Sequence, residues 1–552
     1  MGKKVLIGAA WPYVNGSLHL GHAAALLPAD ILARYFRAHG DDVLYVSGSD
    51  CHGTPILVTA DREGQTPEAV ANRYHDEFVE TLIRKLGCSY TLYTKTMGAF
   101  HQRHAQELFQ TIHDRGFMTP RTETNPYCAT CVRFLPDRYV EGTCPNPDCR
   151  KQGARGDQCD ACGHVHDARD LVAPVCRTCR TSPEWRSSTH LYFRLPLVAD
   201  RLKAWIATQD HWRDNALRMT SSWIERGLQD RPITRDLEWG VPVPIADFTD
   251  KRMYVWFEAV MGYLTCSREW AASTGNPEAW REWWENEDAV HYYVHGKDNI
   301  PFHTIIWPGM LMALGLHLPN WIVSSEYMNF GSVKFSKSAG TAIWLPSALE
   351  KFDADAIRFY LMLNGPETKD TSFDWKDFQH RVNGDLVGNV GNFWNRTLTL
   401  VHRHFGSVPA PGTDAESGAL IAAAAQAFDT VGTAIARAEF RRALSLILEL
   451  SQQANRYISA REPWRTIHTD RDKTAATLGT CVVAMDAIRR LIAPFVPKTA
   501  ERLGVALGDT DTAWRVPDSL VGRTIAAPSA IIPKIDDATI DAEIAKMRSS
   551  EA

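Results

Sequence analysis

The sequence predicts a soluble α/β protein in which a parallel β-sheet is interrupted by a cysteine-rich insertion and followed by an α-helical bundle. Three observations lead to this fold class. Strand, loop, helix and strand follow one another at the N-terminus, eight of the 12 cysteines fall within one window, and the C-terminal part shows long helical periodicity. The 552 residues are 45% hydrophobic and 23% charged, which excludes a collagen-like or largely disordered chain.

The N-terminal segment has the pattern of a βαβ unit. Residues 5–10 form a short apolar run typical of a buried strand, turn-forming residues follow, and a helical pattern covers residues 18–39. A second apolar run at 42–48 predicts a strand parallel to the first, joined to it by a right-handed crossover. Further helices are expected at 67–86 and 98–115.

The cysteine-rich insertion begins near residue 116 and ends near residue 231. Its eight cysteines form three CxxC pairs and one CxxxxC pair: Cys128/Cys131, Cys144/Cys149, Cys159/Cys162 and Cys176/Cys179. Zn²⁺ takes four thiolates tetrahedrally, and a spacer of two to four residues lets one turn supply two of them. We therefore expect two Cys₄ zinc sites, structural rather than catalytic. Disulfides and a redox dithiol are the alternatives, although a redox motif needs one pair rather than four.

The α/β pattern returns after the insertion, with apolar runs at 253–256, 291–296 and 321–324. A Pro/Gly-rich connection then leads into three long helical patterns, which predict a helical bundle at residues 419–437, 440–459 and 473–493. No apolar run approaches the roughly 18 residues of a membrane span, and the N-terminus turns polar too soon for a signal peptide. We expect a cytoplasmic protein without a membrane partner. The net charge of −5 argues against a generally basic nucleic-acid binder but allows a local basic surface.

Two short motifs indicate chemistry on phosphates. His19-Leu20-Gly21-His22 opens the first predicted helix, where backbone N–H groups and the helix dipole favour an anion. Lys334-Phe335-Ser336-Lys337-Ser338 reads as a loop that offers cations to phosphates. Each motif is weak alone, because histidine pairs and lysine-rich loops are common.

Together, in this order and on either side of a split sheet, the motifs resemble the HIGH and KMSKS signatures of class I aminoacyl-tRNA synthetases. Other segments closely resemble the methionyl-tRNA synthetase family: AWPYVNG at 10–16, GSDCHGTP at 48–55, VWFEA at 255–259, and GKD at 296–298 with Phe302-His303. The resemblance extends to about residue 525. It implies activation of methionine by ATP, through an adenylate and pyrophosphate, and then transfer of methionine to the 3′ end of tRNA(Met).

The resemblance also implies roles for individual residues. Asp50 would hold the ammonium of methionine, and aromatic rings suit its sulfur. The expected methionine-binding set is Ala10, Trp11, Tyr13, Asp50, Trp256, Ala259, Val260, Tyr263, Phe302 and His303. Trp11 and Val260 depart from the commonest family pattern, which is leucine and proline, and they put the outline of the pocket in doubt.

For ATP, the resemblance implies contacts from both motifs, with His19, His22, Lys334 and Lys337 acting on the phosphates during catalysis. The expected ATP-binding set is His19, Gly21, His22, Asp298, Lys334, Ser336 and Lys337. Asp298 would hold the ribose, and Mg²⁺ is expected with ATP, without assigned ligands.

For the zinc sites, we expect a nested arrangement, with side-by-side knuckles as the alternative. The inner ion would take Cys144, Cys149, Cys159 and Cys162, and the outer one Cys128, Cys131, Cys176 and Cys179. In the bundle, the resemblance implies that Asn392, Arg396 and Trp464 bind the anticodon. Single-stranded loops are recognised by stacking and by base-edge contacts. Without the resemblance, a buried core tryptophan would be the better interpretation of Trp464.

The implied organisation has six parts. These are the first half of a Rossmann-like catalytic domain at 1–115, a connective insertion with zinc knuckles at 116–231, the second half of the catalytic domain at 232–323, a stem-contact region with the KFSKS loop at 324–385, a helical anticodon-binding domain at 386–525, and a C-terminal tail at 526–552. The chain ends shortly after the bundle, from which we expect a monomer.

Two alternative functions remain open at this stage. An isoleucyl-, leucyl- or valyl-type synthetase shares the early motifs but normally carries a large editing insert. A zinc-ribbon RNA-binding protein without activity would not need His19, His22, Lys334 and Lys337 together.

Overall fold

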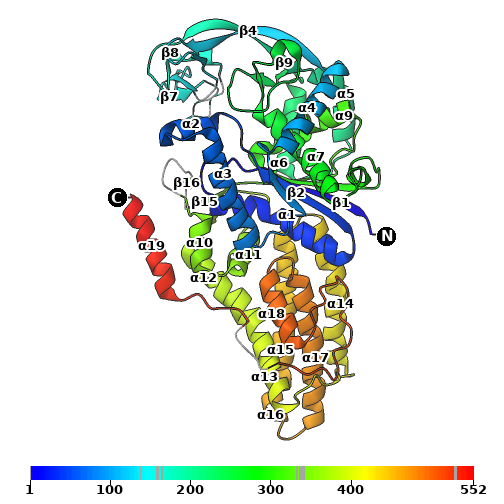
Figure 1. The fold of residues 1–552 in the computed structure, drawn as a ribbon. Coiled ribbons are helices and arrows are strands. Elements are labelled where there is room, and N and C mark those ends of the chain that lie inside the picture. Colours follow the sequence, from blue (N-terminus) through cyan, green and yellow to red (C-terminus); the bar gives the residue numbers. More distant parts are fainter. Residues whose placement is uncertain are drawn as a thin grey trace.

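The computed structural model describes residues 2–136, 139–156, 159, 161–162, 164, 166–330, 333–334, 342–526 and 531–551. A parallel sheet lies in the middle of the molecule, with the cysteine-rich insertion beyond one side of it and the helical bundle beyond the other (Figure 1). The predicted order of sheet, insertion and bundle is therefore confirmed.

The central sheet has the strand order β14–β13–β1–β2–β3, and all its pairs are parallel. Its strands are β1 (Lys4–Ala9), β2 (Asp42–Ser49), β3 (Leu92–Lys95), β13 (Val290–Gly296) and β14 (Trp321–Ser325). Ile7 of β1 lies between Tyr45 of β2 and Tyr292 of β13, so strands from before and after the insertion meet at β1. The strand order reverses at this point, and ligands of open α/β sheets bind at such switch points, beyond the carboxyl ends of the strands.

Helices cover both faces of the sheet. Successive side chains of a strand point to opposite faces, so the apolar strands present apolar side chains on both of them. Leu6 packs in one core and Ile7 in the other. On the Ile7 face lie α1 (Leu20–His39), α3 (Pro67–Phe78) and the π-helical turn η1 (Val79–Lys85). On the Leu6 face lie α4 (Ala99–Asp114), α7 (Val255–Ser273), α8 (Arg281–Trp284), the π-helical turn η7 (Phe302–Ile306) and α9 (Trp307–Leu314). The helix expected at 18–39 begins at Leu20, because His19 is its extended N-cap residue.

The insertion is an antiparallel arm that carries a small separate core. Its strands are β4 (Met118–Cys128), β5 (Arg133–Phe134), β9 (Glu184–Phe193) and β10 (Arg231–Pro232), with the knuckle sheet β6 (Val140–Thr143), β7 (Gln152–Arg155) and β8 (Val172–Cys176) at its end. The short helix α2 (Thr54–Glu63) contributes Leu57 and Val58 to this small core. The return to the sheet runs through α5 (Ala199–Ile206), α6 (Asp214–Glu225), β11 (Thr234–Arg235) and β12 (Arg252–Met253). Residues 253–256 join β12 to the beginning of α7, whereas 291–296 and 321–324 lie in β13 and β14.

A connecting region lies between sheet and bundle. It contains β15 (Met328–Phe330), β16 (Val333–Lys334), α10 (Leu345–Lys351), α11 (Ala354–Leu363), β17 (Thr371–Phe373), α12 (Trp375–Arg381) and the π-helical segment η8 (Val382–Gly391). A short sheet of order β16–β15–β17 ties this region together directly after β14. The C-terminal helix α19 (Asp537–Glu551) packs against α12 and forms ion pairs from Glu543 to Lys351 and from Asp541 to Lys376.

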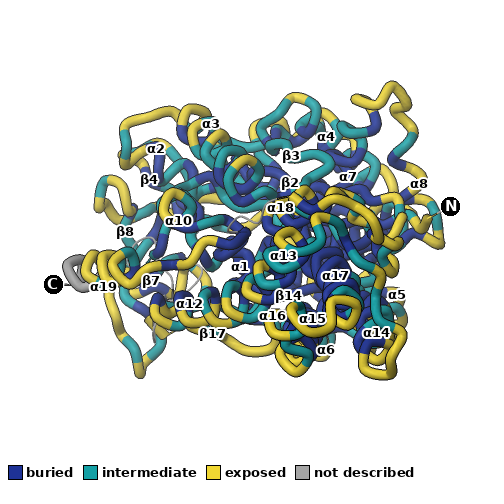
Figure 2. Tube along the Cα trace, turned by 90° about the horizontal axis from the view of Figure 1, so that it is seen from below, coloured by how far each residue is buried: buried dark blue, intermediate teal, exposed yellow. Residues whose placement is uncertain are grey.

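The bundle consists of long helices around α17, which Figure 2 shows in dark blue because most of its residues are buried. Its members are α13 (Asn392–His404), α14 (Ala415–Ala436), α15 (Phe440–Arg461), α16 (Pro463–Thr466), α17 (Arg471–Ile492) and α18 (Pro497–Leu507). In the described part of the chain, α14 alone is long and apolar enough to cross a membrane by composition. This helix packs against α15 and α17, as a core helix of a bundle does.

Candidate active site

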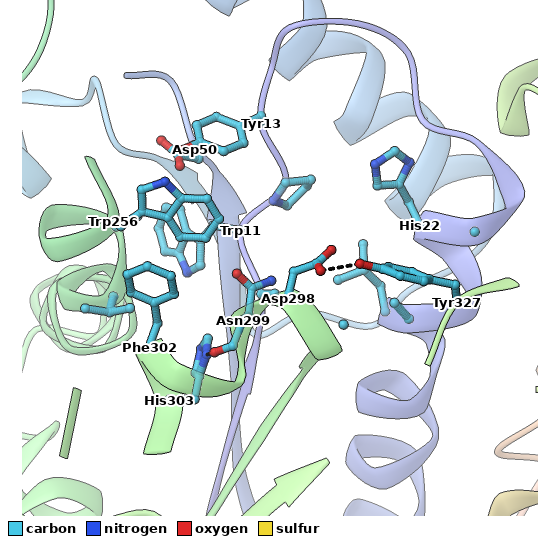
Figure 3. A pocket seen from close by; sticks show the side chains of 18 of the residues that line it. Trp11, Tyr13, His22, Asp50, Trp256, Asp298, Asn299, Phe302, His303 and Tyr327 are labelled. Atoms are coloured by element: carbon cyan, nitrogen blue, oxygen red, sulfur yellow. Dashed lines mark hydrogen bonds between the residues drawn. The ribbon is translucent and has the colours of Figure 1, made fainter. Parts of the chain in front are cut away.

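One cleft of about 510 Å³ opens at the carboxyl ends of β1, β2, β13 and β14. All ten residues expected to bind methionine line it, and so do His19, Gly21, His22 and Asp298. The predicted side chains come from segments far apart in the sequence and meet around this single cleft (Figure 3). Its two ends differ in chemistry and are described in turn.

One end of the cleft is aromatic. Trp256, Ala259, Val260 and Tyr263 recur at the three- and four-residue spacing that places side chains on one face of α7. The Trp256 ring stacks on Phe302 with centroids 4.6 Å apart, and Tyr13 meets Trp256 edge to face at 5.7 Å. Stacked and edge-to-face rings restrict one another's orientation, so this end has a defined shape.

His303 forms part of this wall in a defined tautomer. Its Nδ1–H donates to the Asn299 carbonyl at 2.9 Å, which leaves Nε2 to accept from the Tyr263 hydroxyl at 2.8 Å. Burial lowers the pKa of His303 to about 4, so the ring is neutral at physiological pH. A neutral imidazole suits a pocket for an apolar side chain.

Trp11 is accommodated by two glycines. A Cβ atom on Gly48 would lie 2.3 Å from the Trp11 ring, and one on Gly262 would lie 2.7 Å from it. The unexpected indole therefore fits because both neighbouring positions lack a side chain. Val260 is buried and keeps the apolar character of the wall.

Asp50 lies at the border of the aromatic end, directly after β2. Its carboxylate accepts from the backbone N–H of His52 at 3.3 Å, and no ion pair to Asp50 is found in the described part of the chain. Burial, together with the negative charge of Glu258, raises the pKa of Asp50 well above its ordinary value. A buried carboxyl without a cationic partner is suited to bind a cationic ligand group.

The other end of the cleft is polar and begins at the N-terminus of α1. The backbone N–H of His19 donates to Nδ1 of His22 at 3.1 Å, and the two rings lie 3.7 Å apart. Because α1 has no acidic residue in its first turn, the positive end of its dipole faces the cleft without a competing charge from that turn. The arrangement suits phosphate groups.

Sequence reasoning did not assign several other residues that line the cleft, among them Asn299, Glu326, Tyr327 and Met328. The Tyr327 hydroxyl donates to the Asp298 carboxylate, and Lys297 forms an ion pair with Glu326 at 2.6 Å. Glu326 and Tyr327 directly follow β14, just as Asp50 directly follows β2. Polar residues at the carboxyl end of a parallel strand are typical of a ligand site, and this position in the sequence could have identified both residues.

The segments on either side of the KFSKS motif lie next to the polar end of the cleft. Ser336 and Lys337 lie outside the described residues, and of Lys334 only the backbone is described, in β16. At the start of the motif, Lys334 pairs with Asn329 of β15, which adjoins the cleft residue Met328. After it, the N–H of Leu345 donates to the Leu18 carbonyl at 2.8 Å, and the N–H of Leu20 donates to the Ile343 carbonyl at 3.0 Å. The segments before and after the KFSKS motif are thus held close to the His19–His22 motif.

The eight cysteines of the insertion form two clusters among the described residues, with the predicted nested pairing. Cys128, Cys131, Cys176 and Cys179 form one cluster, and Cys144, Cys149, Cys159 and Cys162 form the other. Opposed Sγ atoms lie 3.8 Å apart for Cys144 and Cys162, and 3.9 Å apart for Cys149 and Cys159. Four sulfurs at 2.3 Å from a tetrahedral Zn²⁺ would be separated by about 3.8 Å, which these two distances and the 3.9 Å between Cys131 and Cys176 match. Cys128 and Cys179 lie closer, at 3.3 Å, and all four distances exclude disulfides.

The helix α16, which carries Trp464, lies at the end of the bundle away from the sheet (Figure 1). Asn392 and Arg396 are one helical turn apart on α13. The Arg396 guanidinium lies 4.8 Å from the centre of the Trp464 ring, which is 37% exposed. The exposed ring agrees with the interpretation of Trp464 as a surface residue rather than a core tryptophan.

Comparison with known proteins identifies the class of protein. The family model of class I tRNA synthetases (M) matches residues 5–398, and the model of the anticodon binding domain of methionyl tRNA ligase matches residues 408–551. The fold is that of a class I aminoacyl-tRNA synthetase.

Individual relatives narrow this class. Methionine–tRNA ligase of Roseiflexus castenholzii is 43% identical, with 100% of this chain and 99% of the relative covered, and that of Thermomicrobium roseum is 46% identical, with 93% and 88% covered. The structure of Mycobacterium tuberculosis methionyl-tRNA synthetase in complex with methionyl-adenylate superimposes with a TM-score of 0.79 at 25% identity, over 96% of this chain and 100% of that one. The chain belongs to the methionyl-tRNA synthetase family and has the activity of a methionine–tRNA ligase. Both alternatives, another amino acid and a non-enzymatic RNA-binding protein, are therefore wrong.

Proposed function

We propose that the two ends of the cleft divide the activation of methionine between them. The aromatic end would bind the thioether side chain, Asp50 would pair with the ammonium, and the polar end would bind ATP. The observation that carries this proposal is that the whole predicted methionine-binding set lines the same cleft as His19, Gly21, His22 and Asp298 of the predicted ATP-binding set. Asp50 lies beside Tyr13 and Trp256 in this cleft (Figure 3).

In this arrangement a carboxylate oxygen of methionine attacks the α-phosphorus of ATP and pyrophosphate leaves. The chain contributes position and charge rather than a nucleophile. His19 and His22 would contact the phosphates from the start of α1, Gly21 would allow their close approach, and Asp298 would hold the ribose. Lys334, Ser336 and Lys337 would reach the phosphates from the loop whose flanks adjoin the first motif.

Metal ions would have two separate tasks. Zn²⁺ in the two Cys₄ clusters would cross-link the insertion, whose own hydrophobic core is small. Mg²⁺ would enter with the ATP phosphates. The nearby carboxylates of Asp298 and Glu326 already bond to Tyr327 and Lys297, so we assign no protein ligand to Mg²⁺.

The tRNA would contact the bundle and the connecting region. Trp464, with Arg396 above its ring, offers a surface on which an unstacked anticodon base can lie. Asn392 would pair with a base edge, and residues 324–385 would contact the stem. The same proposal includes a monomer in the cytoplasm, which light scattering of the purified chain and fractionation of cells test.

Amino-acid-dependent exchange of pyrophosphate into ATP tests the cleft directly. We expect exchange with methionine and none above background with isoleucine, leucine or valine. Exchange with one of these instead would contradict the assignment of the aromatic end. Mass spectrometry under native conditions should find two zinc ions per chain, and a single ion would show that one cluster serves another purpose.

A further inference from the structure

A buried carboxylate lies behind the cleft without lining it. Glu258 is two residues after Trp256 on α7 and is completely buried. Nδ1 of His52 lies 3.1 and 3.2 Å from its two oxygens, and Nε2 of His101 lies 2.8 Å from one of them. The Thr265 hydroxyl, 2.7 Å from Nδ1 of His101, can donate there and leave Nε2–H to donate to Glu258. Three elements, α4, α7 and the loop after β2, thus meet at one carboxylate.

This network ends on the loop that carries Asp50. His52, held by Glu258 through its ring, donates its backbone N–H to Asp50. The Cys51 peptide between them is also held on both sides, because its N–H donates to the Thr96 hydroxyl at 2.9 Å and its carbonyl accepts from Trp239 Nε1 at 2.7 Å. The loop therefore has little freedom to turn the Asp50 carboxylate.

Stability alone gives a weak reason for such a network. Burying a carboxylate between two imidazoles is costly, and well-packed apolar residues of similar volume are often at least as stabilising. What such a network does provide is a fixed orientation of its side chains, because a fully satisfied polar network holds its members in one geometry.

We propose that Glu258 is a positioning residue for the ammonium of methionine: through His52, and braced by His101, it fixes the Asp50 carboxylate at the border of the aromatic end. The inference rests on the proposed role of Asp50. Glu258 itself is not among the residues that line the cleft.

The electrostatics of the site agree with this geometry and supply a readout. Burial opposes ionisation of Glu258, but His52 and His101 lower its pKa to about 2, so it stays charged. The groups facing Asp50 are Glu258 from α7 and His52 from its own loop, with His101 from α4 behind Glu258. The negative charge of Glu258 raises the pKa of Asp50, so its removal should lower that pKa.

The test is the Glu258→Gln substitution in the full-length enzyme, assayed by methionine-dependent pyrophosphate exchange. We expect KM for methionine to rise about tenfold while kcat stays within about threefold and KM for ATP is unchanged. The acidic limb of kcat/KM for methionine should move to lower pH by about one unit. A role in folding alone would not move this limb, so an unmoved limb or an unchanged KM for methionine would overturn the proposal.

Further variants separate the possible failures. His101→Gln keeps the charge of Glu258 but alters a donor, so KM for methionine should rise less and the acidic limb should stay in place. If Glu258→Gln does not fold, His101→Gln decides, and an unchanged KM for methionine there counts against the network.

Asp486→Asn removes a buried acid of the bundle, 0% exposed and paired with Arg489, and should leave exchange unchanged. If Asp50→Asn leaves KM for methionine unchanged, the role of Asp50 itself is wrong, whatever the Glu258 variants show.

Discussion

The two ends of the cleft are built on opposite principles. The aromatic end consists of stacked rings, a neutral buried histidine and a buried carboxyl whose loop is bonded on every side. The polar end consists of a helix N-terminus, an exposed Asp298 and the KFSKS motif, whose neighbouring segments on both sides are held by backbone hydrogen bonds. One end offers a defined apolar shape with a single carboxyl group, whereas the other offers a helix dipole and charged side chains.

The difference follows from what each ligand can contribute. A thioether carries no charge and few hydrogen bonds, so selection among apolar amino acids depends on a fixed shape, and one methylene is worth only about 1–3 kcal/mol. ATP carries several negative charges, which dipoles and cations recognise without close shape matching. Substitutions at the two ends should therefore change different kinetic constants.

The largest effect is expected for Asp50→Ala. It removes the partner of the ammonium from a buried position, and kcat/KM for methionine in pyrophosphate exchange should fall by about 10³-fold or more. KM for ATP should change little, because the polar end keeps all its groups. Circular dichroism should show an unchanged fold. Methionine turnover close to that of the unaltered enzyme would show that the ammonium binds elsewhere.

A second substitution addresses the polar end. His22→Asn keeps a polar side chain but removes the ring that lies beside His19, and kcat of exchange should fall by about 10²-fold, the effect of losing one group that stabilises developing charge. Methionine should still bind with its normal Kd in calorimetry without ATP. Loss of methionine binding in this variant would mean that the two ends are not independent.

The ease of prediction also differs between these parts. The parallel sheet, the helix that begins after His19 and the four cysteine pairs follow from local spacing, because strand periodicity, a helix start and a CxxC turn are each set by a few neighbouring residues. Local spacing does not decide which two cysteine pairs share a site, since side-by-side knuckles also fit the sequence. Glu258 and His101 carry no such signal, since their contact arises only when α4 packs against α7. Likewise, nothing near Trp11 in the sequence indicates that Gly48 and Gly262 make room for its ring.

A third, smaller effect should appear far from both ends. Trp464→Ala removes a stacking surface worth about 1–3 kcal/mol per base, so kcat/KM for tRNA in aminoacylation should fall about tenfold. Pyrophosphate exchange should be unaffected, because it needs no tRNA. Trp464→Phe retains a ring and should recover most of the charging activity. An equal loss in both assays would make the residue structural.

The smallest effect is expected for His303→Gln, which distinguishes the titration of Asp50 from that of His303 at the aromatic end. The ammonium of methionine requires an ionised Asp50, whose pKa is raised by burial and by Glu258, so KM for methionine should rise as the pH falls through that raised pKa. His303 has a pKa of about 4 and is already neutral throughout the range from pH 8 to pH 5.5. His303→Gln should therefore raise KM for methionine only a few-fold, about the effect of one neutral hydrogen bond, and should leave the acidic limb where it is. Pyrophosphate exchange at a series of pH values measures both quantities for the two proteins. If the limb disappears in His303→Gln, the histidine titrates, and the aromatic end depends on a charge that its burial should exclude.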